Sequence, residues 1–451
     1  MRCLILPCET RVREFRAKLL LALVAASRGV PAIVGAKKTI DLNLDRYPSG
    51  VYVGKSVTAR SRHNLLLARA CGHRVALWDE EGLVWASREV YWRTKVDAAT
   101  LNTPELLLAW GDMNAQAWTE HPDYHGAPVI AAGNPRADLL KPALRPLFEA
   151  DAQAIRAQFG DFILVNTNFS RVNHVQPRQN RHLKWLREQC PDDPRGGFAA
   201  HKFQLFQAFC QTLPALARAM PEQRFVIRPH PSERTETWKD LVNDLPNVTV
   251  AHEGNVVAWL LACRGLIHNG CTTALEAYQL GKPAVAYMPL PASDFDHPLP
   301  NGVSLACPDE ASLTDRVRQL AQAPEALFAE QQTGQAGELM RQALAGADRE
   351  VLDCLSLLDA LAPLLSRPAV AAGKRSRLAL ALRRAVRPIE HRLPGTANYG
   401  PYLEHMFPSV RDEEVEADVQ RMSACLSLES MPRVRRIGDN VFELKPAAAV
   451  G

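Results

Sequence analysis

The 451-residue sequence lacks most of the features that mark specialised proteins. Its ten cysteines form no C-x-x-C pair and show no zinc-like spacing, which points to reduced thiols in the cytoplasm. No apolar run reaches the roughly 18–20 residues of a membrane span, and the N-terminus lacks the long apolar segment of a signal peptide. A net charge of +4 gives no general affinity for nucleic acid. We therefore expect a cytoplasmic globular protein with no nucleic-acid partner.

The sequence does contain two series of short apolar runs separated by helical patterns, which predicts βαβ units and parallel sheets. The first series comprises Cys3–Pro7, Ala32–Val34, Val51–Val53, Val75–Trp78, Leu106–Ala109 and Val129–Ala131. The second series comprises Phe162–Val165, Phe225–Arg228, Val248–Ala251, Gly265–His268, Ala284–Tyr287 and Gly302–Ala306. We predict an α/β protein with two doubly wound, Rossmann-like domains that face a central cleft.

Composition sets the predicted domain boundaries. Gly133-Asn134-Pro135-Arg136 interrupts the first series, and Lys141–Phe159 reads as a charged helical connector. The polar segment Asn173–Gly197 is expected to be a long excursion carrying one helix. The predicted parts are an N-terminal domain (1–145), a C-terminal domain (146–365), and a basic linker with a helical tail (366–451).

Three acids, Asp79, Glu80 and Glu81, stand directly after the fourth predicted strand, and Gly82 follows them. Like charges held together raise the pKa of at least one carboxyl, and a base tuned in this way suits proton removal from a hydroxyl. Gly82 would let the backbone turn sharply toward a substrate. A solvated acidic turn is the alternative interpretation.

A histidine between two prolines follows a strand of the second series, in Arg228-Pro229-His230-Pro231-Ser232-Glu233. The prolines restrict the backbone on both sides of His230, so the imidazole is presented rigidly. A rigid imidazole beside Arg228 suits contact with a phosphate. A turn histidine without a ligand is the alternative.

Two hydroxyls open the helix that follows Gly265–His268, in Asn269-Gly270-Cys271-Thr272-Thr273. Backbone N–H groups and the helix dipole favour an anion at such a position. Glu276, one turn into the helix, could hold the hydroxyl pair of a ribose. The alternative is a capping box of Thr273 with Glu276, since the T-x-x-E spacing fits one.

At these residues the chain resembles the two-domain GT-B glycosyltransferases that use CMP-activated acidic sugars, namely bacterial sialyltransferases and capsule Kdo transferases. Those enzymes carry an acidic-acidic-Gly, a His-Pro and a paired Ser/Thr motif, matched in the same order here by Glu80-Glu81-Gly82, His230-Pro231 and Thr272-Thr273. The resemblance implies that one acid, with Glu81 favoured, activates the acceptor hydroxyl. It also implies that His230 contacts the donor phosphate and that the threonines hold it. Threonines stand here where serines are usual.

Longer segments resemble a family of surface carbohydrate biosynthesis proteins, a likeness that spans most of residues 1–310 and implies a pathway rather than a reaction. These segments are Glu9–Leu19, Gly133–Leu140 and Phe162–Phe169. We therefore predict a glycosyltransferase of cell-surface polysaccharide biosynthesis (capsule or lipopolysaccharide). It would move a Kdo or sialic-acid-like sugar from a CMP donor to a hydroxyl of a glycan or lipid-linked glycan.

Four further residues are candidates by position alone. Asn166 and Asn168 follow the first strand of the second series and would face the nucleotide, although a structural turn explains them equally well. Arg11 and Arg13 follow the first strand of the chain and would meet an anionic acceptor, or would simply be solvated. No Asp-x-Asp pair stands at a predicted sheet edge, so we expect chemistry without a metal or another cofactor.

Two other functions remain open: transfer of a polyol phosphate from a CDP-activated donor, and a non-catalytic scaffold that binds nucleotide or glycan. The basic stretch Lys374–Arg392 allows two further interpretations. It either makes peripheral contact with an anionic inner membrane or forms a solvated linker. Leu378 and Leu382 would share a helix face there, whereas Leu380 would not.

Overall fold

The structure is a computed structural model that describes residues 2–190, 192–368, 371–394, 396 and 398–447. Its internal contacts divide the chain into two units. Unit 1 comprises Met1–Leu83, Tyr91–Leu147 and Arg341–Gly451, and unit 2 comprises Val84–Val90 and Phe148–Met340. The unit boundaries fall in or beside helices α4 (Arg88–Thr94), α8 (Pro146–Phe159) and α17 (Ala336–Ala343).

Unit 1 is built on an eight-stranded sheet in the order β13-β14-β2-β1-β3-β4-β5-β6. Strands β1 to β6 run parallel, and their order reverses between β1 and β3, where ligands bind in doubly wound folds. The strands are β1 Cys3–Cys8, β2 Ala32–Ala36, β3 Gly50–Gly54, β4 Arg74–Leu77, β5 Leu106–Ala109, β6 Val129–Ala131, β13 Arg433–Gly438 and β14 Val441–Lys445. The helices besides those at the boundaries are η1 Arg11–Phe15, α1 Arg16–Ser27, α2 Lys37–Leu42, η2 Leu44–Arg46, α3 Ala59–Ala70, α5 Ala98–Leu101, α6 Asp112–Thr119, α7 Pro135–Asp138, η3 Pro142–Leu144, α18 Asp353–Ser366, α19 Lys374–Glu390, α20 Gly400–Met406 and α21 Asp412–Cys425.

Helix α1 explains why the C-terminal residues belong to unit 1. Its residues from Ala17 to Ala26 are all buried, and a helix that is apolar all round needs partners on every side. Strands β1 and β2 contact α1, and so do α7, α18 and α21. The predicted domain ranges, which place nearly all of α18 in the C-terminal domain (146–365), remain a prediction. In the structure α18 packs on α1.

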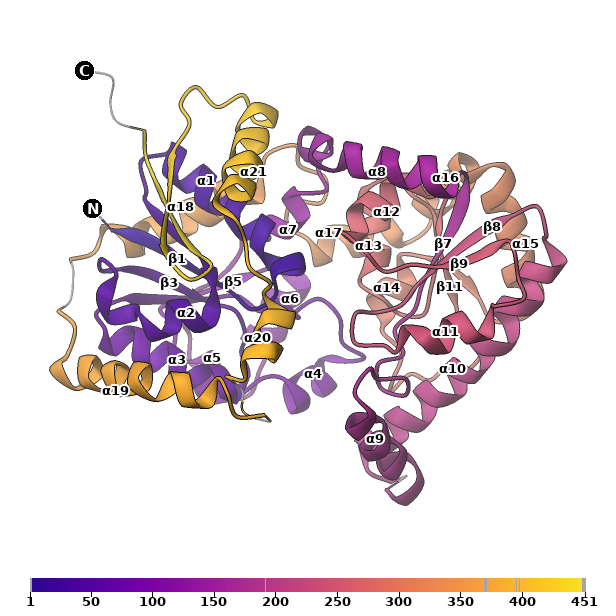
Figure 1. Cartoon of the computed structure of the whole chain (residues 1–451), viewed down its shortest axis with the longest axis horizontal. Coiled ribbons are helices and arrows are strands. Elements are labelled where there is room, and N and C mark those ends of the chain that lie inside the picture. Colours follow the sequence, from indigo (N-terminus) through magenta and orange to yellow (C-terminus); the bar gives the residue numbers. More distant parts are fainter. Residues whose placement is uncertain (1, 191, 369–370, 395, 397, 448–451) are drawn as a thin grey trace. The chain divides into compact units, whose positions relative to one another are not determined.

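The tail also contributes a β-hairpin that the sequence analysis did not anticipate (Figure 1). Strand β14 is buried along Val441–Leu444 and pairs antiparallel with β2, while β13 pairs with β14. Asn440 adopts φ 53° in the connecting turn, a conformation that asparagine tolerates. The outer strand β13 reads Arg-Val-Arg-Arg-Ile-Gly, and its charges protect the sheet edge from further pairing.

Unit 2 contains a six-stranded, all-parallel sheet in the order β12-β11-β10-β7-β8-β9. Numbered within the unit, this is the order 6-5-4-1-2-3 of a dinucleotide-binding fold, with its reversal between β7 and β10. The strands are β7 Phe162–Asn166, β8 Arg224–Arg228, β9 Val248–Val250, β10 Leu266–His268, β11 Ala284–Tyr287 and β12 Leu305–Cys307. The helices within the unit are α9 Pro177–Gln189, α10 Pro194–Ala219, α11 Thr235–Leu241, α12 Val256–Ala262, α13 Thr273–Gln279, α14 Pro298–Gly302, α15 Glu310–Gln322 and α16 Pro324–Thr333.

The two predicted series of strands are therefore confirmed as two sheets, and the α/β class is correct. The predicted excursion after β7 carries α9, but it leads directly into the 26-residue helix α10, which was not predicted. Strand β12 begins at Leu305 rather than Gly302, because Pro298–Gly302 forms helix α14. Within the described part of the chain, no helix has the length and apolarity needed to cross a bilayer.

Gly35 in β2 should be required for docking of the hairpin. A Cβ at this position would lie 2.1 Å from the carbonyl oxygen of Asn440 and 2.7 Å from Cα of Val441. We expect Gly35→Ala to lower the free energy of unfolding by about 1–3 kcal/mol more than Gly29→Ala. Gly29 also has a positive φ, but a Cβ there would meet no atom within 4 Å, so it controls for backbone strain. Equal losses in chemical denaturation would contradict this account.

Candidate functional site

Three residues end neighbouring strands at the carboxyl edge of the unit 2 sheet. His268 on β10 is the register partner of Asn166 on β7, which is in turn the partner of Arg228 on β8. This edge contains the reversal of strand order, where doubly wound sheets bind ligands. Asn166 is buried, and its Oδ1 has no hydrogen-bond partner in the part of the chain that the structure describes. Arg228 donates to the carbonyl oxygens of His252 and Gly254 in the loop after β9.

His268 shapes the loop that follows β10. Its ring is fully buried, and Nδ1 accepts hydrogen bonds from the backbone N–H groups of Gly270 (3.1 Å) and Cys271 (3.3 Å). Nε2 therefore carries the proton and donates to Oγ of Ser304, 2.8 Å away. Burial and the nearby Lys202 ammonium lower the pKa of His268 to about 3. The neutral ring thus holds the loop in place, and Gly270 supplies the φ of +71° that the turn requires.

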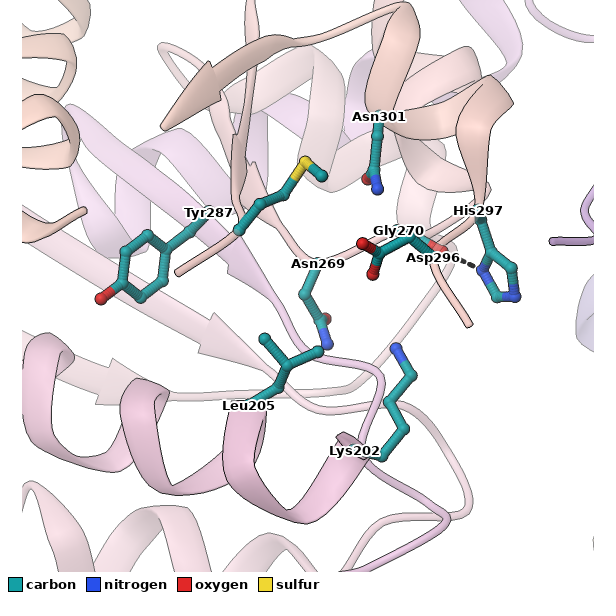
Figure 2. Close-up of a pocket in the computed structure, with 9 residues that line it drawn as sticks. Lys202, Leu205, Asn269, Gly270, Tyr287, Asp296, His297 and Asn301 are labelled. Carbon is teal, nitrogen blue, oxygen red and sulfur yellow. Dashed lines mark hydrogen bonds between the residues drawn. The ribbon is translucent and has the colours of Figure 1, made fainter. Parts of the chain in front are cut away.

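Asn269 projects from this loop into a small hollow that is partly open to solvent (Figure 2). The residue is only 4% exposed, and neither amide atom has a hydrogen-bond partner among the described residues. A buried amide left in this state costs about 1–3 kcal/mol. Such a group is explained most directly by a ligand or solvent molecule that it is arranged to bind.

Lys202, on α10, points its ammonium into the same hollow (Figure 2). It is 5% exposed and forms no ion pair within the described residues; its Nζ lies 5.8 Å from the ring centroid of Phe198. Burial lowers the pKa of Lys202 to about 8. The Asp296 carboxylate lines the same hollow and opposes this shift, but it makes no direct ion pair with Lys202 among the described residues. A desolvated ammonium without a direct ion pair is a favourable partner for an anionic group.

The far wall of the hollow consists of His297 and its neighbours. The His297 Nδ1–H donates to the carbonyl oxygen of Gly270 at 2.9 Å, which leaves Nε2 as an acceptor. Burial and the Lys202 ammonium lower the pKa of His297, so the ring is neutral. Asp296 accepts from the backbone of Ala292, and Oδ1 of Asn301 is buried without a partner. The hollow therefore offers both acceptors and a cation.

The His-Pro loop is held by a carboxylate that was not among the predicted site residues. Glu233 is 3% exposed and accepts hydrogen bonds from Thr167 Oγ1, Trp238 Nε1 and the backbone N–H groups of Phe169 and His230. It therefore ties the loop after β7 to the loop after β8. The half-buried His230 accepts at Nδ1 from the N–H of Ser232, which in the neutral ring leaves the proton on Nε2.

The hydroxyl pair opens helix α13, as predicted, but the capping box does not form. The helix begins at Thr273, and neither Thr272 nor Thr273 makes a side-chain cap. Both threonines and Glu276 are half-buried at the carboxyl edge of the sheet. Asn168 is also half-buried, two residues beyond β7. The structure thus brings the predicted nucleotide-side residues to one edge of unit 2.

In unit 1 the acids after β4 have three different environments, and Glu80 lies in a buried ion network. Its Oε1 accepts from Nζ of Lys18 at 2.8 Å and from Nε1 of Trp78 at 2.9 Å, while Oε2 is buried without a partner. Lys18 also donates to Glu14 (2.9 Å) and to the carbonyl oxygen of Pro7 (2.8 Å). Burial opposes the ammonium, but the carboxylates of Glu14 and Glu80 prevail and raise the pKa of Lys18.

Glu81 is the exposed member of the trio. Its side chain is 51% exposed, it pairs with Lys95, and its Oε1 lies 3.8 Å from the guanidinium of Arg13. Burial raises the pKa of this carboxyl, but the Lys95 ammonium and then Arg13 outweigh burial and hold it below its ordinary value. Arg11, the other predicted acceptor-side arginine, instead forms an ion pair with Glu414 of α21.

Asp79 is the acid whose pKa is raised. It is 3% exposed and accepts from Tyr91 Oη at 2.8 Å, and burial raises its pKa to about 6. Neighbouring like charges were expected to cause such a shift, yet burial is the largest cause and the Glu81 charge is a minor one. Nε1 of Trp110 also donates to the Asp79 carbonyl oxygen at 2.6 Å. Asp79 therefore lies in a closed aromatic environment.

Several of these residues carried only weak signals in the sequence. Lys18 is a single charge directly before the apolar run Leu19–Ala26. A charge on a helix that is buried all round must be paired. Lys202 lies in a helix that was not predicted, so nothing linked it to the loop after β10. His268 was within a quoted segment, but no pattern distinguished its buried structural role. No three His, Cys, Asp or Glu residues cluster as a metal site in the part of the chain that the structure describes.

No protein-family model matches the chain, and no curated protein matches it. Solved structures do resemble it. The structure of S. aureus MnaA with UDP has 11% identity and a TM-score of 0.51, covering 83% of this chain and 100% of that one. A UDP-GlcNAc 2-epimerase from Neisseria meningitidis, bound to UDP-GlcNAc, has 12% identity and a TM-score of 0.49, covering 80% and 100%. The pneumococcal O-GlcNAc transferase GtfA, with UDP and GlcNAc, has 10% identity and a TM-score of 0.42, covering 73% and 60%. At this identity the likeness concerns the fold, which is GT-B with two Rossmann-like sheets.

Asp79 should give stability a measurable pH dependence. Its pKa is about 6 in the folded chain against an ordinary 3.8, so the native state binds this proton more tightly than the unfolded state. Stability present below pH 3.8 is therefore lost as pH rises toward 6. We expect the unfolding free energy of the wild type to fall by up to about 3 kcal/mol relative to Asp79→Asn over this range. Denaturation at several pH values measures the difference, and the exposed Asp123→Asn should follow the wild type. Parallel profiles for wild type and Asp79→Asn would refute the assignment.

Proposed function

We propose that this chain is a glycosyltransferase of cell-surface polysaccharide biosynthesis that takes a nucleotide-sugar donor on unit 2 and an acceptor hydroxyl on unit 1. The observation that carries the proposal is the unsatisfied polar pair at the carboxyl edge of unit 2. Asn269 and Lys202 are each at least 95% buried. Among the described residues, the two amide atoms of Asn269 have no hydrogen-bond partner and the ammonium of Lys202 has no ion pair. An anionic, hydrogen-bonding ligand at this edge would satisfy both.

We propose CMP as the nucleotide and an acidic, Kdo or sialic-acid-like sugar as its cargo, with a glycan or lipid-linked glycan as acceptor. His230 and Arg228 would contact the donor phosphate, together with Thr272 and Thr273, and Glu276 would hold the ribose. The reaction would take place in the cytoplasm.

For the catalytic base we propose Glu81, because an acceptor hydroxyl can reach it. Glu80 is enclosed by Lys18 and Trp78, and Asp79 is bonded to Tyr91, so neither carboxylate is open to a bulky glycan. Lys95 and Arg13 hold the pKa of Glu81 low in the unliganded chain, which makes it a weak base. An anionic acceptor that drew these cations away would raise its basicity.

Two rival functions use the same edge of unit 2. Transfer of a polyol phosphate from a CDP-activated donor would need the nucleotide side but no base at Glu81. A non-catalytic scaffold would bind nucleotide or glycan without turnover. The S. aureus structure that shares this fold contains UDP, so a uridine nucleotide is a third ligand to test.

A nucleotide panel tests the donor side. We expect CMP or CDP to stabilise the wild type, by about 2.7 kcal/mol at a concentration near 100 times the dissociation constant. Lys202→Met and Asn269→Ala should each weaken that binding by about tenfold or more, since each loses a charged or buried hydrogen bond. Thermal shift with CMP, CDP, UMP, UDP, GDP and ADP measures the response.

Lys184→Met is the matched control, because this lysine of α9 has a side chain 66% exposed and lies outside the hollow. It should bind nucleotide like the wild type. A response only to UDP or GDP would overturn the cytidine part of the proposal, and no response to any nucleotide would overturn the donor site.

Glu81→Gln tests the base. The amide keeps the size of the side chain but cannot accept a proton, so we expect kcat for transfer to fall by about 10²–10⁴-fold while nucleotide affinity is unchanged. The surface variant Glu413→Gln on α21 should retain full activity. Retained transfer in Glu81→Gln, measured with radiolabelled donor sugar, would rule out Glu81 as base; retained polyol-phosphate transfer would favour the rival enzyme.

A further inference from the structure

Helix α19 presents an apolar stripe to solvent. Leu378, Leu382, Val386, Ile389 and Leu393 are 63%, 60%, 48%, 62% and 50% exposed. Leu378, Leu382, Val386 and Ile389 recur at steps of four, four and three residues, which keeps them on one face of α19, and Leu393 follows three residues after the helix ends. These are five of the fourteen exposed large apolar side chains among the described residues, gathered within sixteen positions. Scattered exposed leucines need no explanation, but a continuous stripe of this kind marks an interaction surface.

The opposite face of the helix fixes its orientation on unit 1. Leu380 is fully buried, and Oγ of Ser376 donates to the carbonyl oxygen of Ala70 on α3 at 2.9 Å. Arg384 makes a bidentate contact with Asp45, at 2.6 and 3.0 Å. In the sequence, Leu380 interrupts the amphipathic pattern of Leu378 and Leu382. It is instead the anchor that turns the stripe outward, and the segment is an ordered helix docked beside α2 and η2 (Figure 1).

Cations flank the stripe. Lys374, Arg375, Arg377 and Arg392 are exposed and form no ion pair with the described residues, and Arg387 is half-exposed. On a helical wheel Lys374 lies on one side of the stripe and Arg383 on the other, while Arg375 lies in line with the stripe and Arg377 lies toward the buried side. Arg392 follows the end of α19. The one carboxylate in this segment, Glu390, accepts from Asn398. A basic helix with an exposed apolar face of this form lies in the plane of a membrane interface, where each Lys or Arg near anionic lipid contributes about 1 kcal/mol.

We propose that α19 docks unit 1 onto an anionic lipid surface, with the Leu378–Leu393 stripe inserted among the acyl chains and the flanking cations on the headgroups. A second copy of the chain is a poorer occupant, because a twofold contact through this stripe would bring the same cations face to face. The inference does not rest on the proposed transferase activity, since lipid binding requires no donor or acceptor.

Vesicle flotation of the full chain tests the docking surface. We expect binding to vesicles of about 70% phosphatidylcholine and about 30% phosphatidylglycerol at low salt, with weak binding to pure phosphatidylcholine. Leu382→Asp with Val386→Asp should reduce the bound fraction at least about tenfold by removing the apolar insertion. Lys374→Glu with Arg375→Glu and Arg377→Glu should reduce it as strongly and also abolish its salt dependence.

Matched controls change similar residues of unit 1 elsewhere. Met431→Asp, at a side chain 51% exposed, and Arg433→Glu on β13 should bind like the wild type. The altered side chains are exposed, so each variant should fold. Circular dichroism and melting temperature check that it does. The proposal is overturned by absent binding to anionic vesicles, by equal binding of the stripe variants, or by equal binding to neutral vesicles. Self-association that the stripe variants abolish, without lipid binding, would assign the surface to a second copy instead.

Discussion

Parallel pairing of strands is the constraint on which both candidate sites depend. In a parallel sheet every strand ends at the same edge, so residues far apart in sequence become neighbours if they follow strands. Asn166, Arg228 and His268 are separated by tens of residues, yet register makes them adjacent. In unit 1 the same rule brings the start of η1, the end of β3 and the acids after β4 together, where Lys55 pairs with both Glu9 and Glu14. Reversal of the strand order then leaves room at that edge for side chains and ligands.

The two edges differ in how completely their buried charges are satisfied. In unit 1 the Lys18 ammonium donates to two carboxylates and a carbonyl oxygen, which is as many acceptors as it has protons. The Lys18 ammonium is thus fully satisfied, although Oε2 of Glu80 has no partner among the described residues. In unit 2 the Lys202 ammonium and the Asn269 amide share a hollow without satisfying each other. Since buried polar groups in folded proteins are nearly all bonded, the open network is the better candidate for binding.

The sheets were predictable from the sequence because strands buried on both faces read as continuous apolar runs. The hairpin β13–β14 was not, because its outer strand is dominated by arginine and its apolar residues matter only against β2. Helix α10 was obscured by the polar segment before it. Among the candidate site residues, the sequence pointed to those in short segments after strands but did not single out Lys202 and Glu233. Their roles arise from contacts across the fold, with the loops after β10 and β7, and no local spacing encodes such contacts.

Local context also decides what identical chemistry does. The run Asp79-Glu80-Glu81 reads as three equivalent acids, but one is bonded to a tyrosine, one to a lysine, and one faces solvent between two cations. Burial raises the pKa of Asp79, whereas the Lys95 ammonium and Arg13 outweigh burial and lower the pKa of Glu81. The net charge of the whole chain likewise hides local differences. A net charge of +4 suggests no strong partner, yet seven of the 53 basic residues lie in the nineteen positions of Lys374–Arg392. Leu380 and Arg384 fix that helix on unit 1, so its other cations are held near one apolar stripe. The attractions of these cations to an anionic surface add up, although the net charge of the whole chain predicts no such attraction.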